Sequence, residues 1–151
     1  MPEVYNMKLI YLFALVVGVV HHVNSLKIDF SHHDPPHKDC AGHGHAGHGH
    51  GHGHVHFPQA NIEKLNRGET VDLNCPEFTQ HLLCIWKEKG VMNEEGVLQK
   101  EVITSKVSKI AGSNTEDIKK VENCAIQQAT PGKTAIHFYN CIAPLVKKYN
   151  S

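Results

Sequence analysis

A tract rich in histidine and glycine is the part of this sequence whose side chains are best suited to binding metal ions. Fourteen histidines occur in the 151 residues, and ten of them lie between residues 32 and 56. Imidazole suits zinc, copper and nickel, and His-X-His spacing on a flexible chain lets several rings reach one ion. Because many equivalent ligand sets exist, we expect adventitious binding of Zn, Cu or Ni and no required cofactor. The candidate ligands are His43, His45, His48, His50, His52, His54 and His56.

Five cysteines supply a second kind of chemistry, since they allow at most two intramolecular disulfides and leave one thiol over. If a continuous helix follows Cys75 and includes Cys84, these two lie roughly 13 Å apart, which is too far for a disulfide. Cys124 and Cys141 fall on consecutive predicted helices that run antiparallel, so they could pair. Cys84 then pairs with Cys40 or stays reduced. Cys75 is expected to be free or to join a second copy of the chain.

Features of catalysis and of nucleic-acid binding are missing. His81 and His137 are the only histidines after residue 57, and no Ser-His-Asp or Cys-His arrangement, HExxH motif or phosphate-binding glycine loop surrounds them. The 15 basic and 15 acidic side chains balance, so no basic surface for nucleic acid is expected. We therefore expect a protein that is neither an enzyme nor a nucleic-acid binder.

The N-terminal residues predict a secretion signal. A lysine precedes the apolar run Leu9–Val20, which is shorter than the roughly 20 residues of a membrane span. Small residues follow, and they place a cleavage site after Ser25, which leaves about 126 residues. We expect a secreted, extracellular protein with no membrane span, in which disulfides are permitted.

The residues that follow the signal cannot build a core. Within residues 26–56, the pair Pro35-Pro36 interrupts any helix. Glycine then nearly alternates with histidine over residues 41–56, and glycine loses much backbone entropy when it is ordered. We therefore expect residues 26–56 to be a disordered His-rich segment and residues 57–151 to be one helical domain.

From residue 57 onward, apolar residues recur at helical spacing, which predicts an all-α domain. Such a small helical domain gains little stability from burial alone, so disulfides are expected to support it. Glycine and proline suggest where the helices begin and end. The expected helices are 59–66 ended by Gly68, one from Pro76 ended by Gly90, one ended by Gly112, one capped by Asn114, and one from about Lys133 to Ile142 that Pro144 ends or kinks. Thr130-Pro131-Gly132 is expected to be a turn.

Residues 81–141 resemble the insect odorant-binding protein family, which includes pheromone-binding and general odorant-binding proteins. Cys84 sits in a predicted helix followed by the loop 89–98, whose sequence is much like the corresponding loop of that family. Cys84 and Cys124 are separated by 39 residues, as the third and fourth cysteines of the family are. Cys141 falls in a segment similar to the last cysteine-bearing helix of the family.

The resemblance is to the reduced-cysteine branch of the family. The family's second and fifth cysteines would fall at Gln80 and Gly132, and both are absent. Two features depart from the family pattern: Cys40 lies where the usual first helix looks lost or remade, and Cys75 has no counterpart. The disulfides that the resemblance implies are Cys40–Cys84 and Cys124–Cys141.

The resemblance also implies a fold and a function. It implies a small disulfide-bridged bundle of five to six helices around an apolar cavity that holds a small hydrophobic ligand, such as an odorant or pheromone. A chemoreceptor is the implied partner, and a dimer through Cys75 is a further option. Tyr139 or His137 could place one hydrogen bond to the ligand. The expected wall is Phe78, Leu82, Trp86, Leu98, Val102, Ile118, Val121, Ile136, His137, Phe138, Tyr139, Leu145 and Val146, although apolar helix stripes are also typical of plain core.

Two other functions are compatible with the sequence. A secreted His-rich protein could scavenge metal or haem and use the helical part only as a scaffold. A saposin-like lipid or membrane binder is also small, helical and bridged, but five cysteines at these spacings fit it poorly.

Overall fold

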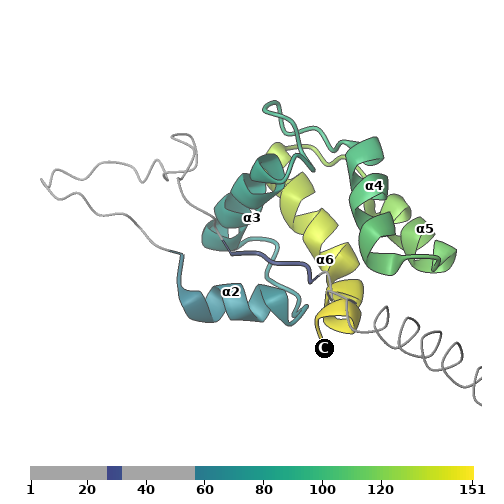
Figure 1. Ribbon diagram of the computed structural model, residues 1–151. Helices are drawn as coiled ribbons and strands as arrows, with labels where there is room; N and C mark the ends of the chain where they lie inside the picture. The colour runs from purple at the N-terminus through teal and green to yellow at the C-terminus, as the bar shows by residue number, and fades with distance from the viewer. Residues whose placement is uncertain (1–26, 32–56) are drawn as a thin grey trace, which may run out of the picture.

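The computed structural model describes residues 27–31 and 57–151, and the described part is all-helical, as predicted. The predicted signal sequence and Gly-His tract lie outside these residues. Within them, Met92 and Leu98 form one isolated β-bridge and no strand is present. The helices are α2 (Gln59–Asn66), α3 (Pro76–Glu88), α4 (Lys100–Ala111), α5 (Thr115–Cys124) and α6 (Pro131–Asn150), shown in Figure 1.

Local sequence signals set most helix boundaries. Helix α3 begins at Pro76, where the missing N–H is not needed. The side chain of Asn114 caps α5 by accepting a hydrogen bond from the Asp117 backbone at 3.1 Å. Gly68 follows α2 with a φ of +67° and lies so close to α6 that a Cβ atom there would approach Ala143 O to 2.3 Å. Glycine at this position therefore both terminates α2 and permits its close packing against α6.

Helix α6 begins earlier than predicted. The segment Thr130-Pro131-Gly132 was expected to be a turn, but Pro131 is the first residue of the helix. The side chain of Thr130 caps the helix by accepting a hydrogen bond from the Lys133 backbone at 3.2 Å. A threonine cap followed by proline is a typical helix start, so the residues interpreted as a turn are the start of the helix itself.

Helix α6 also continues past Pro144, which was predicted to end or kink it. A proline inside a helix costs about 3 kcal/mol. Burial offsets this cost, because Leu145 and Val146 are 9% and 0% exposed and each contributes about 1.5–3 kcal/mol. Pro144 itself lies on the exposed side of the helix. Tertiary packing therefore keeps residues 143–150 helical.

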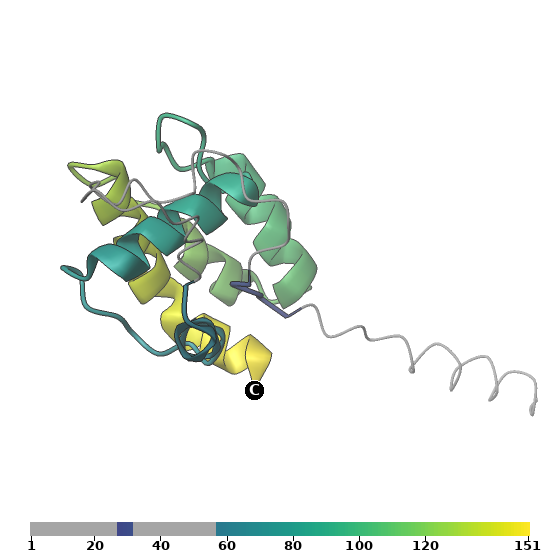
Figure 2. The same cartoon turned by 90° about the vertical axis from the view of Figure 1, so that its left-hand side faces the viewer.

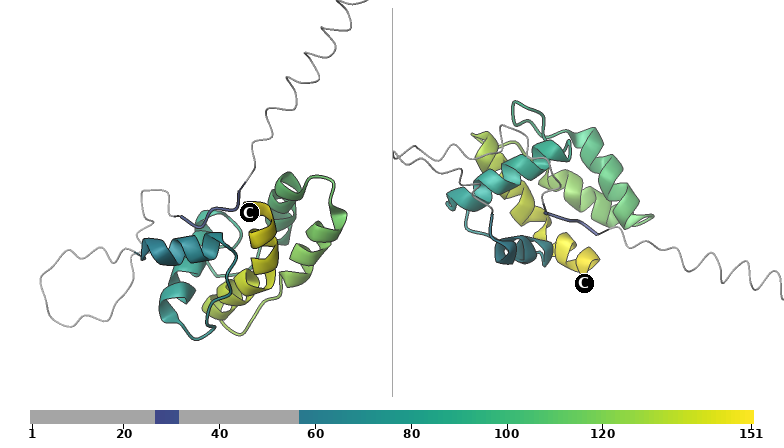
Figure 3. Two further views of the ribbon diagram at one scale, coloured as in Figure 1. Left: turned by 90° about the horizontal axis from the view of Figure 1, so that it is seen from below. Right: turned by 60° about the vertical axis from the view of Figure 1, so that its left-hand side comes forward.

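Helix α6 occupies the middle of the molecule. Figure 3 shows α4 and α5 on one side of it and α2 and α3 on the other, and Figure 2 shows α3 crossing it. A disulfide between Cys124 and Cys141 joins α5 to α6, with the two Cα atoms 5.6 Å apart. Within residues 27–31 and 57–151, no helix combines the length and apolar character that crossing a bilayer requires.

Residues 27–31 belong to the segment 26–56, which was predicted to be disordered, but this prediction is wrong for these five residues. They run in an extended conformation, and the side chain of Phe30 is 0% exposed. The segment, coloured purple in Figure 1, passes between α3 and α2 and reaches α6. We call residues 27–31 the strap. Its order is explained by what it buries, because a fully buried phenyl ring offsets the entropy lost by a few backbone residues.

Candidate ligand site

The predicted wall residues lie mostly in one continuous hydrophobic cluster. Ile118 packs against this cluster, while Val102 and His137 are half-buried and lie outside it. Burial alone does not separate a ligand wall from plain core, so the assignment of these residues to a site stays a prediction. The ten that belong to the cluster are Phe78, Leu82, Trp86, Leu98, Val121, Ile136, Phe138, Tyr139, Leu145 and Val146.

Aromatic rings meet at the centre of this cluster. Trp86 on α3 lies edge-on to Phe138 on α6, with ring centroids 5.3 Å apart. Phe30 of the strap lies edge-to-face against Trp86 at 5.4 Å and against Tyr139 at 5.2 Å. Edge-to-face pairs at these separations are favourable beyond their buried area. The space between α3 and α6 beside Trp86 and Tyr139 is therefore filled by a ring that belongs to neither helix.

Phe30 is not among the site residues predicted from the sequence. Ile28 and Phe30 are apolar residues two positions apart, and Ile28 packs against the same core. This alternation is typical of an extended segment with one buried face. It covers too few residues to stand out beside the low-complexity tract that follows.

Side chains from three helices hold the strap. The Phe30 N–H donates to Asn66 Oδ1 on α2 at 2.9 Å, and Phe30 O accepts from His81 Nε2 on α3 at 2.9 Å. The Ile28 N–H donates to Asn150 Oδ1 on α6 at 2.9 Å, and Asn150 Nδ2 donates back to Ile28 O at 2.8 Å. These side chains satisfy backbone groups that a neighbouring strand would satisfy in a sheet.

His81 also helps to form the wall of this region. Its ring is 6% exposed and stacks on Phe57, with centroids 3.9 Å apart and planes 9° from parallel. Phe57 in turn lies edge-on to Phe78 at 5.2 Å. The start of the described helical segment thereby closes one end of the aromatic cluster.

Tyr139 and Trp86 each carry one hydrogen-bonding group, and each of these groups donates to backbone carbonyl oxygen. The Tyr139 hydroxyl lies 2.8 Å from Glu69 O and 3.0 Å from Leu65 O, and it shares its single proton between these carbonyls, one in the last turn of α2 and one just after the helix. Burial, followed by the nearby charge of Glu69, raises the pKa of Tyr139. Trp86 Nε1 donates to Ala135 O at 3.0 Å. The Tyr139 hydroxyl therefore holds α2 against α6 in this structure, and a hydrogen bond from it to a ligand stays a prediction.

His137 is the other residue predicted to place a hydrogen bond. It is half-buried on α6, and its Nδ1 atom is buried without a hydrogen-bond partner in the part of the chain that the structure describes. A buried nitrogen without a partner is uncommon. His137 thus retains hydrogen-bonding capacity that Tyr139 does not.

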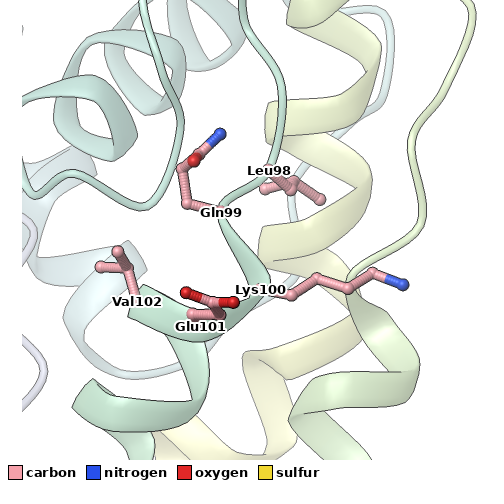
Figure 4. Close-up of a pocket in the computed structure, with 5 residues that line it drawn as sticks. All are labelled: Leu98, Gln99, Lys100, Glu101 and Val102. Atoms are coloured by element: carbon pink, nitrogen blue, oxygen red, sulfur yellow. The ribbon is translucent and has the colours of Figure 1, made fainter.

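A hollow of about 390 Å³ lies at the start of α4. Two predicted wall residues, Leu98 and Val102, line it together with Gln99, Lys100 and Glu101. In Figure 4, Val102 and Lys100 extend in opposite directions from the first turn of α4. Ligand pockets are mostly apolar, and the two exposed charged residues make this hollow a poor match for a hydrophobic molecule. Leu98 thus lines this hollow as well as belonging to the hydrophobic cluster, whereas Val102 lines the hollow and lies outside the cluster.

Asp117, in the first turn of α5, is a buried charge. Its side chain is 3% exposed and forms an ion pair with Lys148, while Tyr149 donates a hydrogen bond to it at 2.7 Å. The hydrogen bonds from Lys148 and then from Tyr149 lower the pKa of this carboxyl group. A buried carboxylate is tolerated when it is paired in this way. Asp117 therefore joins α5 to the last turns of α6.

The four cysteines that the structure describes agree with the predicted pairing. Cys124 and Cys141 form the predicted disulfide, and Cys75 is free and half-buried just before α3. Cys84 is disulfide-bonded, and Cys40, its predicted partner, lies outside the described residues. The dimer through Cys75 stays a prediction.

Within residues 27–31 and 57–151, no three His, Cys, Asp or Glu side chains are grouped closely enough to hold a metal ion. The histidines predicted to bind zinc, copper or nickel all lie in the tract outside these residues. Metal binding by that tract therefore stays a prediction from the sequence.

Comparison with known proteins identifies the class. Residues 52–144, more than half of the chain, match the PBP/GOBP family, so the chain belongs to this family and the resemblance seen in the sequence is confirmed. This is a family of binding proteins rather than of enzymes, and it does not need cofactors.

Individual relatives are distant. The chain is 29% identical to the B2 protein of Tenebrio molitor over 84 residues, which are 56% of this chain and 64% of that protein. It is 27% identical to the B1 protein of the same species over 54% of this chain and 61% of the relative. It is 25% identical to odorant-binding protein 10 of Aedes aegypti over 55% and 59%. The match thus spans less than two thirds of each relative, and no solved structure matches significantly.

Proposed function

We propose that this protein is a secreted carrier that binds a small hydrophobic molecule, such as an odorant, a pheromone or a similar lipophile, in the interior between α3 and α6. The observation that carries the proposal is the aromatic centre formed by Trp86, Phe138 and Tyr139 in a chain of the PBP/GOBP family. A ring from outside the bundle, that of Phe30, fits among these residues.

The chemistry of this interior favours apolar ligands. The hydrogen-bonding groups of Trp86 and Tyr139 are satisfied by backbone carbonyls, so the two side chains offer a ligand only their apolar surfaces. Burial of apolar ligand surface contributes about 25 cal/mol per Å², and this is the main source of affinity. The Nδ1 atom of His137 has no hydrogen-bond partner in the described part of the chain, but His137 lies outside the aromatic cluster, so a polar contact from it to a ligand stays a prediction.

Secretion and partners belong to the same proposal. The apolar run before Ser25 supports export, and a family of extracellular carriers supports delivery of the ligand to a chemoreceptor. The alternative of a metal scavenger rests on the Gly-His tract alone, and we retain metal binding as a separate property of that tract.

Probe displacement tests the proposal. A hydrophobic fluorescent probe, N-phenylnaphthylamine, should bind the folded protein saturably in the micromolar range, a free energy of about −8 kcal/mol, and small lipophiles should displace it. Phe138→Leu should weaken binding, because it changes the interior wall. Val102→Ser should not, because Val102 lines the hollow at α4. Absence of saturable binding by a folded sample would contradict the proposal.

A further inference from the structure

The strap delivers one buried side chain into the candidate site. Phe30 is fully buried, whereas Lys27 is exposed and Ile28, Asp29 and Ser31 are half-buried. The ring of Phe30 contacts Trp86 and Tyr139, which are two of the predicted wall residues. The space it fills is therefore complementary to a single six-membered ring.

The strap is attached in a way that allows it to leave. In the strap, the N–H and C=O groups of Ile28 and Phe30 bond to side chains, namely those of Asn66, His81 and Asn150. They do not form the backbone-to-backbone hydrogen bonds of a β-sheet. Such bonds exchange readily for bonds to water and have small net free energies. No cysteine lies within residues 27–31, whereas α5 and α6 are joined by a disulfide. The predicted bridge from Cys84 to Cys40 holds the chain nine residues beyond the strap and not the strap itself.

We propose that Phe30 is a built-in occupant of the ligand site, so that a ligand enters by taking the place of the Phe30 ring and releasing the strap. This inference rests on the proposed carrier function and specifies how the same site is regulated. A ligand can bind only the molecules in which the strap is open. The apparent affinity for every ligand is therefore the intrinsic affinity multiplied by the open fraction.

The contacts that Phe30 vacates define the class of ligand. Departure of the strap frees His81 Nε2 from Phe30 O, so a ligand oxygen at the same position restores a hydrogen bond that would otherwise be lost in a buried place. The preferred ligand is a small molecule with one six-membered ring and a carbonyl oxygen three carbons away, as in phenylalanine itself. Benzylacetone reproduces this arrangement, and butylbenzene has the same ring and chain length without the oxygen.

Two asparagines on α6 provide a matched pair of variants. Asn150 bonds to both the N–H and the carbonyl of Ile28 in the strap. Asn140 makes the same pair of bonds to the N–H and the carbonyl of Val71, at 2.9 and 2.8 Å. Val71 is not part of the strap. Asn150 also donates to Asn66 O on α2 at 2.7 Å. Asn150→Ala therefore loosens the strap, removes this contact to α2 and leaves the aromatic contacts of Phe30 in place. Asn140→Ala is a control for the loss of the two bonds of the same kind.

Calorimetric titration of the full chain with benzylacetone and butylbenzene tests the proposal. Wild type should bind benzylacetone more tightly than butylbenzene. Asn150→Ala should raise the affinity for benzylacetone about tenfold, and Asn140→Ala should leave it within about twofold of wild type. If Asn150→Ala and wild type bind benzylacetone with equal affinity, the proposed displacement of the strap is wrong, although the carrier function would stand. Failure of both ligands and of the fluorescent probe to bind any folded variant would overturn the carrier function as well.

Amide hydrogen exchange provides a second readout that does not depend on a variant. With benzylacetone bound, the amides of Ile28 and Phe30 should exchange faster than in the free protein, because both are hydrogen-bonded only while the strap is closed. The Val71 amide, which Asn140 protects, should not accelerate. Slower exchange at Ile28 and Phe30 on ligand binding would overturn the proposal, since it would show that the ligand and the strap are held together.

Discussion

The ring of Phe30 meets the indole of Trp86 edge-to-face, with centroids 5.4 Å apart and planes at 79°. Trp86 is the only tryptophan of the chain and is 3% exposed. The fluorescence of one residue therefore reports on the place where the strap, α3 and α6 meet.

Truncation of Phe30 should destabilise the protein. Phe30→Ala removes a fully buried ring, so the free energy of unfolding should fall by about 3–5 kcal/mol in urea titration. Phe57→Ala should cost less, because Phe57 is only half-buried. Equal costs for the two variants would show that Phe30 is not packed as described.

The ion pair of Asp117 should make stability depend on pH in the acidic range. Hydrogen bonds from Lys148 and Tyr149 hold the pKa of Asp117 below its ordinary value of 3.8. The stabilising contribution is therefore complete above pH 3.8 and is lost as the pH falls further and the folded protein takes up the proton. Asp117→Asn should be less stable than wild type at neutral pH. A difference that does not shrink at lower pH would contradict this assignment.

The disulfide between α5 and α6 should stabilise the fold. Replacement of both Cys124 and Cys141 by serine should lower the free energy of unfolding by about 3 kcal/mol, as expected for a short closed loop. Peptide mapping without reduction should give a Cys124–Cys141 peptide and an alkylated Cys75. A Cys75–Cys84 peptide would contradict the continuous helix α3, which separates these two residues.

The Gly-His tract should bind metal in a pH-dependent manner. Ordinary histidine titrates near pH 6.5, and metal requires the neutral ring. Calorimetry should therefore detect zinc or copper binding at about pH 7.5 and its loss at about pH 5. A protein that lacks residues 41–56 should keep its helices and lose the metal. Undiminished binding by that deletion would place the metal elsewhere.

Local signals made much of the fold predictable. Gly68, Pro76, Asn114 and Gly112 each act through the backbone near their own position, and the helices begin or end beside them. The Cys124–Cys141 disulfide was implied by the family resemblance, and the placement of two consecutive helices was compatible with it.

Features that depend on distant residues were not predictable. The helix across Pro144 persists because Leu145 and Val146 find a core to enter, and the sequence does not reveal that core locally. Phe30 is buried because Asn66, on another segment, satisfies its backbone. Most of the predicted wall residues are indeed buried, but periodicity alone could not separate a ligand site from plain core.

Energy transfer from Trp86 to a bound probe tests the central claim most directly, because the only tryptophan lies inside the candidate site. The account predicts saturable sensitised emission of N-phenylnaphthylamine on excitation of Trp86, and loss of that emission when benzylacetone is added. Probe binding without energy transfer from Trp86, or transfer that an excess of small lipophiles does not reverse, would contradict a ligand site between α3 and α6.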